Sequence, residues 1–222
     1  MHPDWQNQIH VYCENHSSSE PEVLQKLTQF TWRKTVNPRQ LSGHLLGRFL
    51  SHLVHTHQPK KILEIGTFTG YATYCLAENA RNETEITTIE ADGEIAHKCQ
   101  EFWKDYPLGS RVNWKVGNAL EYMSEFKDID LIFIDADKHN YQNYFDAGLK
   151  CLSERGLMLF DNTLWSGKVI QGETDKDTQA MHAFNKYAAS HPQVVTTLLP
   201  IRDGLTWVSK LPKNSEVYPI NR

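Results

Sequence analysis

Hard oxygen ligands follow two apolar segments of strand length in this sequence. The run Leu131 to Ile134 stops at Asp135-Ala136-Asp137-Lys138, and the run Leu157 to Phe160 stops at Asp161-Asn162. Short apolar runs that end this abruptly are typical of buried strands. In an open parallel sheet the carboxyl ends of the strands face the ligand crevice, so these carboxylate and amide oxygens are expected to meet there.

Such a set of ligands predicts a site for a hard cation. Oxygen ligands without a nearby His or Cys favour Mg²⁺ or Ca²⁺ over zinc, and two or three protein ligands leave room for water or substrate, as Mg²⁺ prefers. The alternative is that Asp and Asn simply begin turns after strands. The repetition at two strand ends favours the cation site.

Composition describes an ordinary globular chain. It has 222 residues, 40% apolar and 23% charged, with a net charge of −4, which suits one domain and argues against a strongly basic nucleic-acid surface. Its four cysteines lack C-x-x-C spacing, so neither a zinc site nor a disulfide framework is indicated. The start resembles no signal peptide, and no apolar run approaches the ~20 residues of a membrane span. We therefore expect a cytoplasmic protein.

Two helices are expected before the first strand, over 20–34 and 42–57, the former with Ser19 as N-cap. The histidines at 52, 55 and 57 fit a solvated helix end better than a metal site. We interpret residues 1–58 as a helical extension, serving as a substrate lid or a dimer surface, and residues 59–210 as the core of a single domain spanning 1–222.

Strands and helices alternate through this core, which predicts an α/β fold with a doubly wound, mostly parallel sheet. The short join at 200–204 predicts a hairpin and hence an antiparallel last strand. Strands are expected at 62–65, 86–90, 111–116, 131–134, 157–160, 194–199 and 205–209, and helices at 70–80, 92–103, 120–126, 141–152 and 178–190.

The segment from Glu64 to Tyr71 lies where a doubly wound fold binds its nucleotide. A dinucleotide fingerprint has a glycine where this chain has Phe68, so close approach of a pyrophosphate, and therefore NAD, is disfavoured. A nucleoside without a pyrophosphate would still fit, with its amino-acid portion near Gly66 and Glu64. Glu90 ends the second strand, where an acid can bind both ribose hydroxyls, while Asn118 and Ala119 would border the adenine. This pattern fits S-adenosylmethionine as well as NAD.

With these segments in view, the sequence closely resembles the cation-dependent, catechol-type O-methyltransferases, a group that contains the caffeoyl-CoA O-methyltransferases and small bacterial relatives. The resemblance covers residues 42–210 and is carried by the segments 63–71, 133–138, 161–167 and 199–205. It implies a Rossmann-like methyltransferase fold, S-adenosylmethionine as cofactor, and a divalent cation such as Mg²⁺, Mn²⁺ or Ca²⁺.

The resemblance also implies roles for individual residues. Asp135, Asp161 and Asn162 correspond to metal ligands, Lys138 to the general base, and Trp165 to the aromatic wall of the acceptor pocket. The implied cofactor contacts are Ser42, Glu64, Gly66, Phe68, Ala72, Glu90, Asn118, Ala119 and Asp135. Ala72 departs from a serine found in many relatives, which puts one hydrogen bond to the methionine carboxylate in doubt, and Glu90 is often aspartate.

The chemistry supports these roles independently. A phenol with a pKa near ~10 is mostly protonated at neutral pH. A divalent cation that contacts two adjacent phenolic oxygens lowers that pKa and orients the acceptor. Lys138 beside the cation should have a lowered pKa, which suits a proton acceptor. Arg202 and Asp203 precede a turn glycine, and a structural role is expected for them.

The sequence therefore predicts a cytoplasmic, Mg²⁺-dependent O-methyltransferase that acts on a vicinal dihydroxy aromatic small molecule, as a homodimer without membrane contact. Two alternatives stay open. One is a methyltransferase for hydroxylated uridine in tRNA, against which the acidic net charge weighs mildly. The other is a non-catalytic binder of S-adenosylmethionine.

Overall fold

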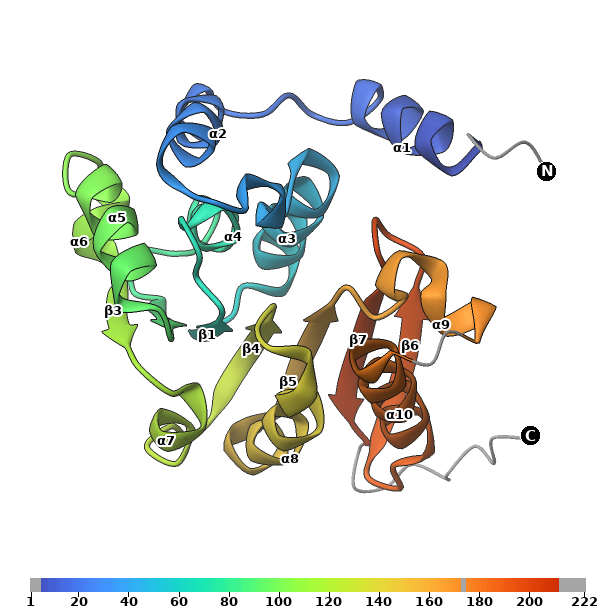
Figure 1. Ribbon diagram of the computed structural model, residues 1–222. Coiled ribbons are helices and arrows are strands. Elements are labelled where there is room, and N and C mark those ends of the chain that lie inside the picture. The colour runs from blue at the N-terminus through green and yellow to red at the C-terminus, as the bar shows by residue number, and fades with distance from the viewer. Residues whose placement is uncertain (1–4, 173–174, 212–222) are drawn as a thin grey trace. The chain divides into compact units, whose positions relative to one another are not determined.

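The structure, a computed structural model, describes residues 5–172 and 175–211 (Figure 1). The chain divides into two compact units. The first comprises Met1–Pro59 and Thr67–Gly117, and the second comprises Lys60–Gly66 and Asn118–Arg222. The predicted single domain over 1–222, with its boundary near residue 58, stays a prediction.

The first unit contains one parallel pair of strands and seven helical elements of the described residues. The pair is β2 (Glu85–Glu90) with β3 (Asn113–Val116). The helices are α1 (Trp5–Asn15), α2 (Glu22–Lys34), η1 (Pro38–Gln40), α3 (His44–His57), α4 (Tyr71–Ala77), α5 (Gly93–Trp103) and α6 (Pro107–Arg111). Helices are thus confirmed within the predicted ranges 20–34, 42–57, 70–80 and 92–103, although α2 begins two residues later and α4 ends three residues earlier than predicted. Helices α1 and α6 were not predicted.

One cap was predicted wrongly. Helix α2 begins at Glu22 with Pro21 at the N-cap and no side-chain cap hydrogen bond, so Ser19 does not cap it. The reason is steric, because the residue before a proline is pushed into extended conformations and Glu20 therefore cannot be helical. At the end of α3, His52, His55 and His57 are exposed, as expected of a solvated helix end.

The second unit contains five neighbouring strands in the order β1-β4-β5-β7-β6. Its strands are β1 (Lys61–Ile65), β4 (Ile129–Ile134), β5 (Leu152–Asp161), β6 (Val194–Leu199) and β7 (Leu205–Lys210). Strands β1, β4 and β5 are parallel, whereas β7 is antiparallel to both β5 and β6. The predicted mostly parallel sheet with an antiparallel last strand is confirmed.

Helices α8 (Tyr141–Cys151) and α10 (Lys176–Ser190) lie on one face of this sheet (Figure 1). The remaining elements of the unit are short: α7 (Ala119–Met123), η2 (Lys138–Asn140), η3 (Trp165–Gly167) and α9 (Lys168–Gln171). Consecutive strand residues such as Ile132 and Phe133 are both 0% exposed although they point to opposite faces. This continuous burial explains why the predicted strands read as uninterrupted apolar runs.

The carboxyl ends of β1 and β4 touch through their backbones. The Asp135 N–H donates to the Ile65 carbonyl at 2.9 Å. Gly66 follows with a φ of +94°, and a Cβ at this position would lie 2.0 Å from the Asp135 carbonyl oxygen. Gly66 is therefore required both by its left-handed backbone and by the neighbouring strand end.

None of the helices over residues 5–172 and 175–211 has the length and apolar character needed to cross a membrane.

Candidate active site

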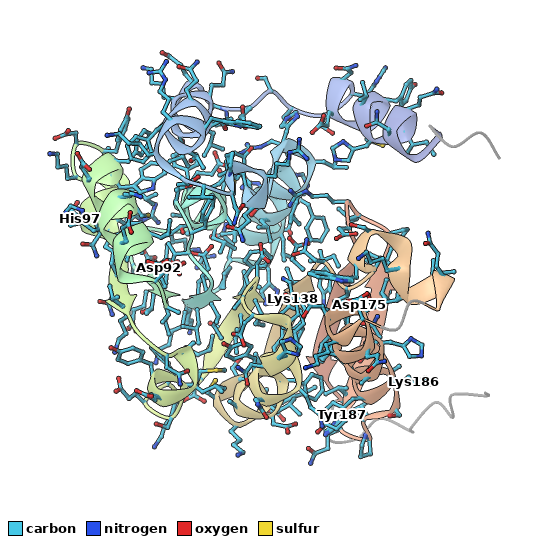
Figure 2. All side chains as sticks on the ribbon, viewed as in Figure 1. Asp92, His97, Lys138, Asp175, Lys186 and Tyr187 are labelled. Atoms are coloured by element: carbon cyan, nitrogen blue, oxygen red, sulfur yellow. The ribbon has the colours of Figure 1, made fainter. Side chains whose placement is uncertain are left out.

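The candidate site lies at the carboxyl ends of β4 and β5 in the second unit. Figure 2 shows Lys138 at this end of β4, with Asp175, the N-cap of α10, at the same end of the unit. Lys138 begins η2, the single turn between β4 and α8, and η2 packs against α10. The short turn brings the lysine back over the strand that it follows.

The Lys138 ammonium contacts ligands predicted at both strand ends. Its Nζ donates to Asp135 Oδ1 at 2.9 Å and to Asn162 Oδ1 at 2.9 Å. A third hydrogen bond of 2.7 Å runs to the Tyr141 hydroxyl. The lysine side chain is only 12% exposed and that of Asp135 19%. The predicted base and two predicted metal ligands therefore form one partly buried cluster.

Asp161, the third predicted ligand, is fully buried at the end of β5. Its Oδ1 accepts the Asn162 N–H at 2.8 Å, and Arg202 Nη1 lies 3.7 Å from Oδ2. Burial raises the pKa of Asp161 to about 7, and the charge of Asp135 adds to the rise, while Arg202 and Lys138 oppose it. Burial is therefore the main cause of the raised pKa of Asp161.

The pKa of Lys138 reflects opposing effects. Burial lowers it, but the Tyr141 oxygen and the Asp135 carboxylate outweigh burial, so the net shift is upward. Burial raises the pKa of Tyr141 as well, which keeps its hydroxyl protonated. Asp135 is therefore the group whose charge holds the proton on Lys138. The lowering expected from a neighbouring cation stays a prediction.

The oxygen atoms of the predicted ligands fit a hard cation. Among the described residues, the buried Asp161 Oδ2 accepts no hydrogen bond, and Arg202 Nη1 lies 3.7 Å away, beyond hydrogen-bonding distance. A buried carboxylate oxygen is costly unless it is closely paired or binds a metal. Asn162, with a φ of +60°, turns its amide oxygen toward the ammonium that also binds Asp135. Residues 5–172 and 175–211 hold no group of three or more His, Cys, Asp and Glu side chains suited to a metal. The three predicted ligands, two carboxylates and one amide, would leave the other coordination positions of the cation to water or substrate, an arrangement typical of Mg²⁺.

The loop after Asn162 carries Trp165, the predicted wall of the acceptor pocket. The Trp165 N–H donates to the Asn162 carbonyl at 3.0 Å, which keeps the tryptophan within one turn of the predicted ligand. Trp165 and Ser166 have φ values of +48° and +53°, a costly conformation for such side chains. Strain of this kind concentrates at functional sites, and the indole here is half-buried.

The turn between β6 and β7 supports this loop. The Leu164 N–H donates to the Asp203 carbonyl at 2.8 Å, and the Ser166 N–H donates to the Asp203 carboxylate. A Cβ on Gly204 would lie 2.5 Å from the Leu164 nitrogen. The structural role predicted for Arg202 and Asp203 agrees with these contacts, since Asp203 braces the loop and Arg202 faces Asp161.

The first unit contains four of the predicted cofactor residues: Ser42, Phe68, Ala72 and Glu90. Phe68 has a φ of +50°, and its N–H donates to Glu90 Oε2 at 2.7 Å. The other oxygen of Glu90 accepts the Asp92 N–H at 3.0 Å. Ala72 in α4 and Ser42 before α3 are both buried. Glu90 therefore ends β2 and orders the loop through Phe68, while its predicted contact with a ribose stays a prediction.

In the second unit, the predicted cofactor residues Glu64 and Gly66 lie at the end of β1, with Glu64 0% exposed. Asn118 is the N-cap of α7, where its Oδ1 accepts the Leu120 N–H at 3.0 Å. Ala119 is the first residue of α7 and is buried. The contacts predicted between these residues and a cofactor stay predictions.

Tyr141 was not predicted as a site residue. The spacing of three residues from Lys138 is the only sequence signal for it, because residues i and i+3 share a helix face. An aromatic residue at the start of a helix is usually core, and Tyr141 is indeed 0% exposed. Its hydroxyl nevertheless contacts the predicted base directly.

The fold and the polar residues at the ends of β4 and β5 are those of a Rossmann-like methyltransferase. The chain belongs to the O-methyltransferase family, whose sequence model matches residues 14–211. It is 31% identical over 204 residues to tapetum-specific methyltransferase 1 of Arabidopsis thaliana, covering 86% of this chain and 88% of that protein. It is 27% identical over 221 residues to the caffeoyl-CoA O-methyltransferase of Stellaria longipes, covering 92% and 90% respectively.

Solved structures agree with this assignment. The crystal structure of the methyltransferase PaMTH1 of Podospora anserina, bound to S-adenosylhomocysteine, superimposes with a TM-score of 0.87 at 27% identity, covering 95% of this chain and 97% of that one. The predicted fold class and family are confirmed, and the chain is an S-adenosylmethionine-dependent O-methyltransferase.

Proposed function

We propose that this enzyme transfers the methyl group of S-adenosylmethionine to one hydroxyl of a vicinal dihydroxy aromatic small molecule. Mg²⁺ or another divalent cation would be held by Asp135, Asp161 and Asn162. The observation that carries the proposal is the convergence of Lys138 Nζ, Asp135 Oδ1 and Asn162 Oδ1 within hydrogen-bonding distance. Similarity to caffeoyl-CoA O-methyltransferases supports the choice of acceptor.

In the transfer, the phenolic oxygen forms a bond to the methyl carbon as the carbon–sulfur bond breaks. The bonding pair stays on sulfur, so the sulfonium becomes the neutral thioether S-adenosylhomocysteine. The phenolic proton passes to Lys138 Nζ, which must be a neutral amine to accept it. When bound, the divalent cation would lower the pKa of the phenol and of Lys138 and orient two adjacent phenolic oxygens.

The residues of the chain would prepare this step. Burial keeps water away from Asp161 and strengthens the electrostatic effect of both carboxylates. Trp165 would flank the aromatic ring, held in place by the braced loop 162–167. A cytoplasmic location and a homodimer complete the proposal.

The acceptor class can be tested with labelled S-adenosylmethionine and matched acceptors. We expect methylation of catechols such as caffeate when Mg²⁺ is present. Compounds in which one of the two adjacent hydroxyls is missing or already methylated should not react, because a single oxygen cannot occupy both positions. Methylation of hydroxyuridine-bearing tRNA but of no catechol would contradict the proposed acceptor. Cofactor binding without any transfer would indicate a non-catalytic binder.

A further inference from the structure

Tyr141 occupies a fully buried position between the ends of β4 and β5. It is the first residue of α8 and is 0% exposed. Its ring packs against Phe160, with centroids 5.4 Å apart, and meets Phe184 edge-on at 5.3 Å. Packing on these sides leaves the phenol a narrow choice of orientations.

The hydroxyl of Tyr141 joins the predicted base to the backbone of the strand ends. It donates to the Asp161 carbonyl at 2.9 Å, with the Ile134 carbonyl farther away at 3.4 Å. Because its single proton points to a carbonyl, its oxygen is left to accept from Lys138 at 2.7 Å. The ammonium also lies 4.8 Å from the centre of the Tyr141 ring.

Lys138 has three N–H groups and three oxygen acceptors around it, on Asp135, Asn162 and Tyr141. Two of these acceptors are predicted cation ligands, whose oxygens would turn to a cation when it binds. Of the three acceptors, only the Tyr141 oxygen is not a predicted cation ligand, so it would keep its hydrogen bond to Lys138 when a cation binds.

We propose that Tyr141 is a positioning residue for Lys138, which holds the lysine nitrogen at the ends of β4 and β5 while its other two partners are engaged elsewhere. This inference rests on the proposed function of Lys138 as proton acceptor. Tyr141 contacts neither cofactor nor acceptor in this account, so its effect on turnover is transmitted through Lys138.

The test is a double-mutant cycle on kcat with Tyr141→Phe and Lys138→Ala. Tyr141→Phe keeps the ring packing and should lower kcat about 10-fold or more, with little change in the KM for S-adenosylmethionine. In the Lys138→Ala background the same substitution should change kcat by less than about 2-fold. An equal loss in both backgrounds would mean that Tyr141 acts through the fold alone, which would overturn the proposal.

Tyr144→Phe provides the matched control. Tyr144 lies one turn further along α8, is also buried, and donates its hydroxyl to Asp137 Oδ1 at 2.5 Å. The substitution Tyr144→Phe removes the same chemical group, a phenolic hydroxyl, from the same helix, and this hydroxyl does not contact Lys138. Its kcat should equal that of the wild type, and a loss as large as that of Tyr141→Phe would contradict a specific role.

A second readout does not depend on catalysis. The Lys138 ammonium should give a ¹H–¹⁵N correlation, assigned by its absence in Lys138→Ala, because three acceptors slow its exchange with water. This signal should shift and broaden in Tyr141→Phe and stay unchanged in Tyr144→Phe. An unchanged signal in Tyr141→Phe would overturn the proposal.

The two proposals can fail separately. If the wild type methylates no acceptor, the proposed function fails, while the NMR comparison still decides whether Tyr141 holds Lys138.

Discussion

The Lys138 ammonium donates a 2.9 Å hydrogen bond to the amide oxygen of Asn162, which lies 24 residues further along the chain. The two residues follow different strands, β4 and β5, which pair in parallel register. The parallel pairing therefore brings the predicted base to a predicted metal ligand. Because the two residues are in contact, substitutions are needed to separate the predicted role of Lys138 as a base from that of Asn162 as a metal ligand.

Replacement of Lys138 by Ala should lower turnover strongly and leave cofactor binding intact. A general base contributes roughly 10²–10⁴-fold to a rate, so kcat should fall by about that factor. Single-turnover kinetics and calorimetry with S-adenosylmethionine check the two halves of this prediction. An equal loss of binding and turnover would remove Lys138 from the role of base.

Added Mg²⁺ should stabilise the wild-type protein against heat. At 100 times its Kd, a ligand of the folded state contributes about 2.7 kcal/mol, which corresponds to a rise in Tm of roughly 5–10 °C for a chain of this size. In Asp161→Asn the rise should largely disappear, because the variant lacks one of two carboxylates at the site.

Asp137→Asn is the control for that experiment. Asp137 belongs to the same motif as Asp135, but its carboxylate accepts from Tyr144 and Asn140 and its side chain is exposed. Its Mg²⁺-dependent rise in Tm should match that of the wild type. The same loss of stabilisation in both variants would point to a diffuse electrostatic effect rather than to a defined site.

Replacement of Trp165 by Ala should weaken acceptor binding. Loss of an aromatic contact is worth about 0.5–1.5 kcal/mol, so the KM for a catechol should rise by up to about 10-fold while the Kd for S-adenosylmethionine stays the same. Trp32→Ala is a suitable control, since Trp32 lies on α2 with 58% of its surface exposed. A rise in the cofactor Kd alone would place Trp165 outside the acceptor pocket.

A buried pair of threonines couples α2 to the loop that follows β1. Thr31 and Thr69 are both 0% exposed, and their hydroxyl oxygens are 2.8 Å apart. Because Thr31 donates its proton to the Leu27 carbonyl, Thr69 must donate to Thr31. Thr31→Val should lower the free energy of unfolding by about 1 kcal/mol, measured by urea titration.

The double variant Thr31→Val/Thr69→Val distinguishes this coupling from independent losses. It should cost little more than Thr31→Val alone, because both single substitutions break the same hydrogen bond. Thr28→Val, which affects a hydroxyl bonded within α2 to the Leu24 carbonyl, is the control for helix effects. Additive losses at residues 31 and 69 would show that the two threonines are not coupled.

Sequence patterns predicted those parts of the fold in which burial is continuous. The apolar runs that became β4 and β5 are buried on both faces, so their ends, and the polar residues there, could be located from the sequence. Helix α1 was missed, and a weak apolar pattern explains this, since Ile9, Val11 and Tyr12 are exposed. The prediction of Ser19 as a cap was wrong because it did not allow for the restriction that Pro21 places on the preceding residue, which moves the start of α2 to Glu22.

The site was predictable where side-chain type indicates chemistry. Asp135, Asp161 and Asn162 could be named from oxygen ligands at strand ends, and the structure brings Asp135 and Asn162 to one ammonium. Tyr141 could not be distinguished from a core aromatic residue by sequence, because its role depends on a hydrogen bond at the far end of its ring. The support of loop 162–167 by Asp203 depends on tertiary contacts between segments about 40 residues apart, which local patterns do not encode.

The most direct test of the account is the initial rate of methyl transfer from labelled S-adenosylmethionine to a catechol, measured before chelation, after chelation, and after addition of excess Mg²⁺. We predict that chelator abolishes transfer and that Mg²⁺ restores it in the wild type but not in Asp161→Asn. Transfer that continues at the full rate in chelator would contradict a cation site at Asp135, Asp161 and Asn162.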